Sequence, residues 1–541
     1  MNEYNESALR ENLIIRKEVK TNAVKESYKI DRRTWLFLSI IIGVGASIRF
    51  YHIGWLSFWV DEGFSEWTIQ HDFWYLWHVL PKFETTPPLY YILLKLWRLL
   101  FGDSEAALRS LSALVSTATI PILFVTGRML DEKIGCRIGL IASLLFSLSP
   151  IQVQYAQEAR TYALFVFFVG VSMFAAIRLM RPGYRGDGIN RNFDMEDSGI
   201  TFYGLGISLA LIFWFHFTGV LAVVAITIPL VYWWVKDINC NRKAFVKLLT
   251  MGFISVLIAF PNFFYFLQNT KNIQKSFWVQ KPNLMSVAKT ISDLFGTQTE
   301  NSSSIVLVLI ALAVFGIREL WYRGFRSVTI LLVFVGIFPI ISELVVSCFT
   351  TSIFLERTLL YVSLPLYILV GYGLSQIEYK YGTPIVIAFI FFFLISVGSF
   401  FGSFEKEPWA EIAGYMSSYL DTDQPVFYAP SYSGVSLEYY MHKKHTKLTA
   451  IGVPSDWPDP TLIGNDQNKI PILRSIEKSD VDKMVVAAQK YSRVGVILRL
   501  QKISDPQNYI LTKMSREFDL VCLKEFPGKI SVMIFSKKTV K

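Results

Sequence analysis

Residues 54–91 read GWLSFWVDEGFSEWTIQHDFWYLWHVLPKFETTPPLYY and directly follow the first long apolar run of the chain. Tryptophan and phenylalanine recur throughout this stretch, which is typical of a helix that lies in the plane of a membrane interface. An acidic pair, Asp61 and Glu62, stands among these aromatic residues and is followed by Gly63. A carboxylate at a bilayer boundary is costly unless it has a partner or a task. The pair is therefore a candidate functional site; the alternative is a solvated acidic turn that caps the next helix.

The composition indicates a polytopic membrane protein. Of the 541 residues, 52% are hydrophobic and 18% are charged, whereas soluble domains carry about 25% charged residues. The formal net charge is +10, but the basic residues lie in short loops between apolar runs, where they set membrane orientation. We therefore expect no nucleic-acid partner. The four cysteines, Cys136, Cys240, Cys348 and Cys522, lie far apart and predict neither a disulfide framework nor a zinc site.

Eleven apolar runs are candidate membrane spans, and the expected total is about 11–13 spans. The runs lie at 35–53, 108–127, 135–150, 161–179, 200–215, 218–235, 246–266, 304–321, 328–347, 357–375 and 384–403. Residues 87–101 are also apolar, but they are few and contain Lys95 and Arg98. Counting them as a span would move the later basic loops to the opposite side of the membrane. We therefore predict a half-span or an interfacial helix there.

Loop charges predict the orientation in the cell membrane. Placing the basic loops in the cytoplasm satisfies the positive-inside rule. The basic groups are Arg32/Arg33, Arg128/Lys133/Arg137, Arg178/Arg181/Arg185/Arg191, Lys236/Arg242/Lys243/Lys247 and Arg318/Arg323/Arg326. Residues 1–34 then form a cytoplasmic tail without a cleavable signal pattern. Residues 35–404 form the membrane domain, whose first outer loop is 54–107.

The composition changes after residue 404. Short apolar runs with strand character (PVFYAP, RVGVILRL, DLVCLKEF and ISVMIFSKK) alternate with the helix-like stretches PWAEIAGYMSSYL and SDVDKMVVAAQKYS. This alternation predicts a small α/β domain over residues 405–541. The predicted orientation places this domain on the extracytoplasmic side. Its expected role is substrate capture or structural support.

The predicted orientation also brings polar residues from distant parts of the chain to the outer face. Besides Asp61 and Glu62, these are Thr86, Tyr90, Tyr91, Arg109, Gln157, Glu158, Arg160, Tyr162, His216, Trp278, Lys281, Glu356 and Arg357. Any single arginine at a helix end is more commonly a membrane anchor than a ligand. Several basic groups and two acidic clusters at one depth favour a reaction centre at the interface.

Several of these stretches occur in the order found in a known class of enzymes. They are WVDEGFSEW (59–67), TPPLYYILLKLW (86–97), LRSLSALVS (108–116), SPIQVQYAQEARTYAL (149–164), LERTLLYVSLPLY (355–367) and EPWAEIAGYMSSYL (407–420). The ordered set resembles polytopic glycosyltransferases of the GT-C class, particularly the protein O-mannosyltransferase and aminoarabinose transferase families. The resemblance covers about residues 35–420 and implies an α-helical polytopic membrane protein with the GT-C fold.

The resemblance implies an inverting transfer of a sugar from a polyprenyl phosphate carrier to an extracytoplasmic hydroxyl on a protein, a glycan or a lipid. Membrane lipids would surround the donor. Asp61 corresponds to the acidic residue of the family's first loop and is the predicted base, while Glu62 would orient the acceptor or a neighbouring cation. Glu158 is a third catalytic candidate that would face the same cavity as Asp61; pairing with a different arginine is about as plausible.

The chain departs from the family pattern at Thr86. Relatives commonly have His or Lys directly before the Pro-Pro pair, and a threonine hydroxyl cannot neutralise phosphate charge. Donor recognition is therefore expected from Arg160, Arg109, Arg357 or Lys281, with Thr86, Tyr90 and Tyr162 as further contacts. Trp59, His216 and Trp278 are candidate contacts for the acceptor or the sugar. The alternatives are an interfacial aromatic belt for the tryptophans and a structural turn for His216.

The main competing class is a transporter or flippase of lipid-linked sugars. Transporters commonly show internal repeats and spans broken near the midplane of the bilayer. Here the charges collect at one interface and no repeat is visible, which favours the enzyme. No cofactor and no metal site are expected from the resemblance, although the outer loops hold enough carboxylates for a divalent ion.

Overall fold

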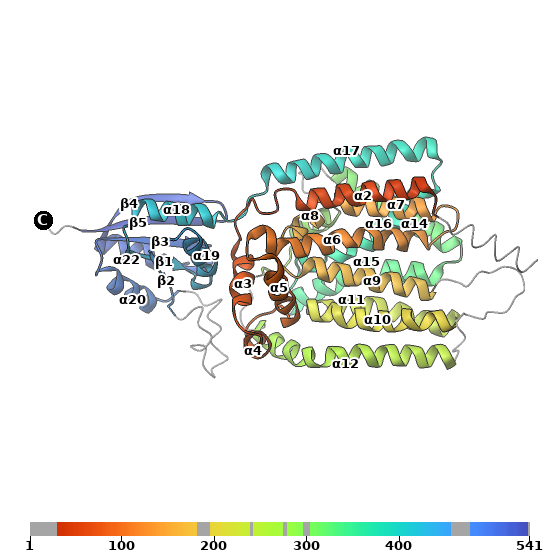
Figure 1. Cartoon of the computed structure of the whole chain (residues 1–541), viewed down its shortest axis with the longest axis horizontal. Coiled ribbons are helices and arrows are strands. Elements are labelled where there is room, and N and C mark those ends of the chain that lie inside the picture. The colour runs from red at the N-terminus through yellow and green to blue at the C-terminus, as the bar shows by residue number, and fades with distance from the viewer. Residues whose placement is uncertain are drawn as a thin grey trace, which may run out of the picture.

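The computed structural model describes residues 30–180, 195–237, 242–273, 279–295, 303–455 and 476–538. Figure 1 shows a bundle of long, roughly parallel helices with a small α/β domain at one end. Three short helices, α3 (Val60–Gln70), α4 (Phe73–His78) and α5 (Pro88–Phe101), lie at the junction between the two parts. The first outer loop predicted from the sequence therefore lies between the bundle and the α/β domain.

The bundle consists of helices that coincide with the predicted apolar runs. They are α2 (Arg32–Phe50), α6 (Glu105–Arg128), α7 (Gly135–Leu148), α8 (Pro150–Ala156), α9 (Tyr162–Met180), α10 (Met195–Phe215), α11 (Gly219–Asp237), α12 (Arg242–Ile273), α14 (Ser303–Tyr322), α15 (Arg326–Phe349), α16 (Ser363–Gln376) and α17 (Tyr379–Ser403). Within the described residues, eight helices are long and apolar enough to cross a membrane, and α7 with α8 forms a pair bent by 62° that would make a ninth. Two shorter apolar helices, Gly199–Phe215 and Leu360–Gln376, complete the eleven predicted positions. The multi-pass architecture is confirmed.

Helix α5 corresponds to the segment predicted as a half-span. Its 14 residues make it about 21 Å long at about 1.5 Å per residue, whereas the hydrocarbon core of a bilayer is about 30 Å thick. The helix ends at Gly102, whose positive φ of 87° suits glycine. Its Lys95 ammonium donates to the carbonyl of Ile69 at the end of α3. This helix is thus too short to cross a membrane and is tied to α3.

The basic residues near the end of α6 lie at the end of the bundle remote from the α/β domain, because α6 begins at Glu105, which contacts Lys443 of that domain, and runs for 24 residues to Arg128. Arg323, after α14, pairs with Asp131 of the α6–α7 connection at 2.7 Å. Arg323 also donates to Gln376 at the end of α16, and Arg137 donates to the carbonyl of Ile377. These contacts join the loops that the positive-inside rule assigns to the cytoplasm in the predicted orientation.

The C-terminal domain is built on one mixed five-stranded sheet. Its strands are β1 (Pro425–Ala429), β2 (Thr449–Gly452), β3 (Arg493–Arg499), β4 (Phe518–Phe526) and β5 (Ile530–Lys537), and its helices are α18 (Trp409–Tyr419), α19 (Gly434–Lys443), α20 (Lys478–Ala488), α21 (Gln501–Ser504) and α22 (Tyr509–Glu517). The order is β2-β1-β3-β5-β4, with β1 parallel to β2 and β3 and with β5 antiparallel to its neighbours. The predicted α/β fold is confirmed. Strand β2 was not predicted, because its four residues are only partly buried at the sheet edge.

Helix α19 joins the C-terminal domain to the first outer loop. The Tyr440 hydroxyl accepts from the backbone of Phe58 at 2.7 Å and donates to Glu105 at 2.8 Å. Lys443 pairs with the same Glu105 carboxylate at 2.6 Å. Gly63 of α3 lies directly against α19, since a Cβ there would stand 3.0 Å from the Cα of Ser436 and closer still to its hydroxyl.

We predict that Gly63→Ala destabilises the protein although alanine is the better helix former. The added methyl collides with Ser436 of α19, and overpacking of this kind typically costs about 1–3 kcal/mol. Thermal unfolding in lipid nanodiscs should show a lower Tm, and Ser436→Gly should restore part of the loss. Gly43→Ala in α2 is the matched control, because nothing lies within 4 Å of a Cβ at Gly43. An unchanged Tm in Gly63→Ala would contradict the close contact.

Candidate active site

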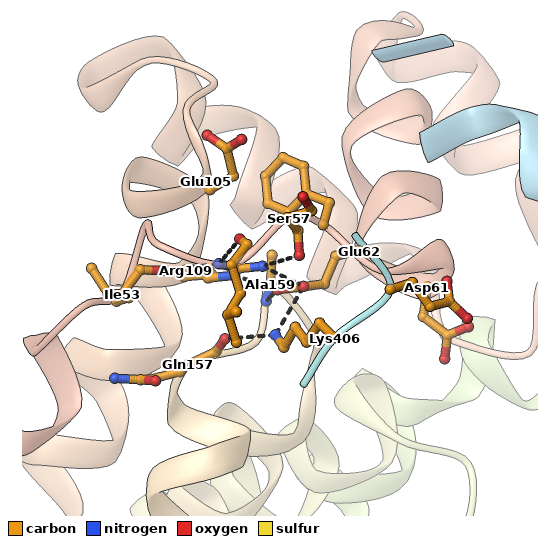
Figure 2. Close-up of polar contacts among 12 residues, drawn as sticks. Ile53, Ser57, Asp61, Glu62, Glu105, Arg109, Gln157, Ala159 and Lys406 are labelled. Carbon is orange, nitrogen blue, oxygen red and sulfur yellow. Dashed lines mark hydrogen bonds and ion pairs between the residues drawn. The ribbon is translucent and has the colours of Figure 1, made fainter. Parts of the chain in front are cut away.

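Glu62 is the centre of a buried polar cluster at the start of α3. Its carboxylate accepts two hydrogen bonds from Arg109 of α6, from Nε to Oε1 and from Nη2 to Oε2, each 2.7 Å long. Lys406, just after α17, donates to Oε2 at 2.9 Å, and the backbone N–H of Ala159 donates to Oε1 at 2.9 Å. Figure 2 shows these groups converging on the carboxylate from three separate parts of the chain.

Arg109 has no donor left for a substrate. Besides the two bonds to Glu62, Nη1 donates to the carbonyls of Ile53 and Leu56, and Nη2 donates to the carbonyl of Ser57. Together these contacts use all five N–H groups of a guanidinium. The side chain is 2% exposed. Arg109 therefore holds the first outer loop in place, and in this structure it has no N–H group left for the phosphate that the sequence predicted it to bind.

The surroundings of Glu62 keep this buried carboxylate ionised. Burial alone would raise its pKa, but Arg109, Lys406 and the Ala159 N–H lower the pKa of Glu62 to about 2. The side chain is completely buried, so it is closed to an acceptor in this structure. Of the two predicted roles of Glu62, the one that these contacts fit is the orientation of neighbouring cations, Arg109 and Lys406.

Asp61 points away from this cluster, as Figure 2 shows. Its side chain is 30% exposed, and Oδ2 pairs with Arg357 Nη1 at 3.1 Å. Arg357 lies in the short helix η2 (Glu356–Thr358) between α15 and α16. Its guanidinium carbon stands 5.7 Å from the ring centre of Tyr162. Adjacent carboxylates on one turn of helix thus have opposite environments, one sealed and one accessible.

Arg160 contacts the backbone of Asp61 and one other predicted donor-binding residue, Thr86. Its Nη1 donates to the Asp61 carbonyl at 3.3 Å and to the Tyr91 hydroxyl at 3.3 Å, and Nη2 donates to Thr86 Oγ1 at 3.4 Å. These contacts are long for charge-assisted hydrogen bonds, which are typically about 2.7–2.9 Å. The Arg160 Nε is buried and has no hydrogen-bond partner in the structure. The guanidinium is thus loosely held on neutral groups.

Two further carboxyl groups lie close to this site. Glu158 is buried, and its Oε2 has no hydrogen-bond partner in the structure. Burial raises the pKa of Glu158 to about 7, against the opposing effect of the Lys406 charge. Glu84 accepts from the Thr86 backbone at 2.8 Å, and burial raises its pKa as well, although Arg160 acts in the opposite direction. Neither Glu84 nor Lys406 was among the site residues predicted from the sequence.

The aromatic and histidine candidates line the site to different degrees. Tyr162 begins α9 beneath Arg357, and its ring centre is 5.7 Å from that of His216. His216 Nδ1 lies 2.8 Å from the Thr218 hydroxyl, and its ring stacks on Phe165. Burial, together with Arg357 and Arg160, lowers the pKa of His216 to about 3. His216 is thus a neutral, hydrogen-bonded turn residue, as the alternative interpretation expected.

The remaining candidates are less closely connected to Asp61. Tyr90 is fully buried in α5, and its hydroxyl has no hydrogen-bond partner in the structure. Trp59 is the N-cap residue of α3 and is partly buried. Lys281 is exposed and donates to the carbonyl of Cys348 at 3.4 Å. Among the described residues, no ion pair joins Lys281 to Asp61. Trp278 lies outside the described residues.

Comparison with known proteins identifies the fold. The model of the "Protein O-mannosyl-transferase TMEM260 N-terminal domain" matches residues 84–239, and no curated protein is significantly similar in sequence. The apo structure of ArnT from Cupriavidus metallidurans aligns with a TM-score of 0.59 at 12% identity, covering 92% of this chain and 97% of ArnT. ArnT bound to undecaprenyl phosphate aligns with a TM-score of 0.57 at 13% identity, covering 93% of this chain and 98% of ArnT.

A third solved structure extends the same comparison. The oligosaccharyltransferase of Archaeoglobus fulgidus aligns with a TM-score of 0.54 at 13% identity, covering 93% of this chain and 73% of that protein. All of these proteins are GT-C glycosyltransferases. The chain is a multi-pass membrane protein with the GT-C fold, and the fold that the resemblance implied is confirmed.

We predict that Glu62→Gln destabilises the fold more than Asp61→Asn does. The substitution leaves Arg109 and Lys406 buried without their counter-ion, and breaking a buried ion pair in this way typically costs about 3–5 kcal/mol. Thermal unfolding of the purified protein in nanodiscs should show a large drop in Tm for Glu62→Gln. Asp61→Asn, at a partly exposed position, should change Tm little. Equal Tm values for the two variants would refute the anchoring role of Glu62.

The pKa of Glu158 predicts a pH-dependent effect of Glu158→Gln. Between the ordinary carboxyl pKa of 4.5 and the folded value of about 7, the folded protein keeps a proton that the unfolded chain has lost. The free energy of unfolding therefore falls as pH rises through this window. Glutamine removes this dependence, so Tm of the variant minus Tm of the wild type should increase from pH 5 to pH 8. A difference that stays constant with pH would mean that Glu158 is not held protonated.

Proposed function

We propose that the protein is an inverting glycosyltransferase that moves a sugar from a polyprenyl phosphate carrier to an acceptor hydroxyl on the extracytoplasmic face. The observation that carries this proposal is the contact of Asp61 with two arginines: its partly exposed carboxylate pairs with Arg357, and its backbone carbonyl accepts a hydrogen bond from Arg160. A base and a cationic phosphate site side by side are the groups that this transfer requires. The fold supports the same class, since ArnT, which shares it, has been solved with undecaprenyl phosphate.

Asp61 is the proposed general base. The acceptor O–H attacks the anomeric carbon of the donor while the bond between that carbon and the phosphate oxygen breaks. The acceptor proton passes to the Asp61 carboxylate, and the carrier leaves as polyprenyl phosphate. Attack from the side opposite the phosphate inverts the anomeric configuration, and a phosphate leaving group needs no strong acid. A positioned base typically contributes about 10²–10⁴-fold to the rate.

Arg160 and Arg357 are the proposed phosphate ligands. A guanidinium stays charged and binds two phosphate oxygens at once. Arg160 suits this role because its present contacts are long and its Nε has no hydrogen-bond partner in the structure. Thr86, 3.4 Å from Arg160, stands where relatives carry a cation. Arg160 would therefore supply the positive charge that Thr86 lacks, with Tyr91 and Tyr162 as neutral neighbours.

The orientation supports an extracytoplasmic reaction. Asp61 belongs to α3, which Figure 1 shows at the α/β-domain end of the bundle, and Arg160 and Arg357 contact Asp61. The Arg323–Asp131 pair lies at the α6–α7 connection, at the opposite end of the 24-residue helix α6. With the basic end in the cytoplasm, the site faces the outer surface of the cell membrane. Its carrier would then lie among the membrane lipids with its phosphate at the interface, and the acceptor would be a protein, a glycan or a lipid.

The proposed function is tested by sugar release from a panel of polyprenyl phosphate sugars by the protein in nanodiscs, with an extract of acceptors added. Wild type should turn over at least one donor. Asp61→Asn should lose at least about 10²-fold, whereas Lys281→Gln, at an exposed position outside the cluster, should retain activity. Equal turnover by Asp61→Asn and wild type would move the base to Glu158. No turnover with any donor, together with carrier movement between leaflets, would establish a flippase instead.

We further propose that the transfer needs no metal ion, because Arg160 and Arg357 can neutralise the leaving phosphate themselves. Removing one preorganised donor of this kind costs about 2.7–4 kcal/mol in other enzymes, so the two arginines suffice for a large effect. Turnover should be unchanged by EDTA. A loss with EDTA that added Mg²⁺ or Mn²⁺ restores would overturn this proposal.

A further inference from the structure

The α/β domain presents the carboxyl ends of its parallel strands to α3. Strand β1 leads into α19, which contacts α3, and then to β2 on one side of the sheet. Strand β3 ends at Arg499 and leads through α21 and α22 to β4 on the other side. The carboxyl ends of β1 and β3 thus form a topological switch point, where α/β sheets commonly place functional groups. Arg499 stands at this point.

Arg499 is engaged with one carboxylate. Its Nε donates to Glu407 Oε1 at 2.6 Å, Nη2 lies 2.6 Å from the same oxygen, and Nη1 donates to the Tyr432 hydroxyl at 3.2 Å. The side chains of Arg499 and Glu407 are 10% and 9% exposed. A nearly buried ion pair holds its geometry tightly, because rotating either partner away leaves the other charge uncompensated.

Glu407 connects Arg499 of the C-terminal domain to α3 of the membrane domain. Its other oxygen, Oε2, accepts from the Trp409 indole at 2.9 Å and from the backbone N–H of Val60 at 3.1 Å. Val60 is the first residue of α3, so Glu407 satisfies one of the N–H groups that a helix leaves unpaired at its start. A carboxylate is also favoured there by the helix dipole. The next residue is Asp61.

We propose that Arg499 is a positioning residue that fixes Asp61 through Glu407 and the first turn of α3. The inference rests on the proposed function and adds to it that the C-terminal domain sets the geometry of the reaction centre. Glu62 with Arg109 anchors this turn from the bundle side, and Glu407 with Arg499 anchors it from the domain side. Losing the second anchor lets the Asp61 backbone shift, and misplacement by about 1 Å can cost about 10²-fold in rate.

The experiment compares Arg499→Met, Arg499→Lys, Glu407→Gln and the double variant Arg499→Met/Glu407→Gln in nanodiscs. Lys443→Met is the matched control, because it breaks an ion pair between the same two domains, with Glu105, away from Asp61. Hydrogen–deuterium exchange over residues 60–64 reports on the first turn of α3 without requiring activity. The values of kcat and KM report on the reaction.

Arg499→Met should speed exchange over residues 60–64 and lower kcat by about 10- to 100-fold with little change in KM, whereas Lys443→Met should do neither. The double variant should be no worse than the worse single variant, since Arg499 acts through Glu407. Arg499→Lys keeps the positive charge, so its exchange rate and kcat should lie between those of wild type and Arg499→Met. It replaces Arg499→Met in the comparison if Arg499→Met does not fold.

Unchanged exchange in Arg499→Met, or equal losses in Lys443→Met, would overturn the positioning role. The proposed function would still stand if wild type turned over donor and Asp61→Asn did not. Faster exchange in Arg499→Met together with no turnover by wild type would support the anchoring of α3 by Arg499 but would overturn the proposed glycosyltransferase function.

Discussion

The buried pair of Glu62 with Arg109 is the interaction on which the site depends. Arg109 donates hydrogen bonds to three carbonyls of the loop before α3, and Glu62 accepts hydrogen bonds from Arg109, Lys406 and the Ala159 N–H. The first outer loop, the α8–α9 connection and the chain after α17 are therefore fixed to one another at a single carboxylate. Because charges are so costly to leave unpaired in this environment, none of these segments can move independently.

The Glu62–Arg109 pair lets two neighbouring carboxylates, Asp61 and Glu62, have different roles. Glu62 is sealed and held ionised, while Asp61, one residue earlier, turns outward to Arg357. On a helix, consecutive side chains point about 100° apart, so one turn can serve the packing of the protein and the proposed chemistry together. Glu407 and Arg499 add a second restraint on the same turn from the C-terminal domain.

Much of the architecture could be predicted because it follows from hydropathy and loop charge. The eleven apolar runs, the short α5 and the α/β character of the C-terminal region all depend on local composition, which a single sequence carries. Strand β2 was missed, because four partly exposed residues give no periodic signal. The sequence also predicted that Asp61, Arg160 and Arg357 lie on the same side of the membrane. This prediction follows from counting the spans once the basic loops are assigned to the cytoplasm.

The partners of buried charges could not be predicted, since they depend on contacts between distant segments. Glu62 and Arg109 are 47 residues apart, and Glu62 and Lys406 are 344 apart. The sequence shows that Arg109 begins a span, but it does not show that carbonyls of the preceding loop use its remaining donors. Lys406 and Glu84 were missed for the same reason. Glu407 is the first residue of the EPWAEIAGYMSSYL stretch, which contributed to the resemblance. The contacts of Glu407 with Val60 and Arg499 are evident only in the fold.

The most direct test is a cryo-EM structure of Asp61→Asn in nanodiscs with a polyprenyl phosphate sugar bound. We expect the phosphate within hydrogen-bonding distance of Arg160 and Arg357, the anomeric carbon facing residue 61, and the Glu62–Arg109 pair unchanged. A phosphate bound at Lys281 instead, or an Arg109 released from Glu62 to bind it, would contradict the proposed assignment of the donor site.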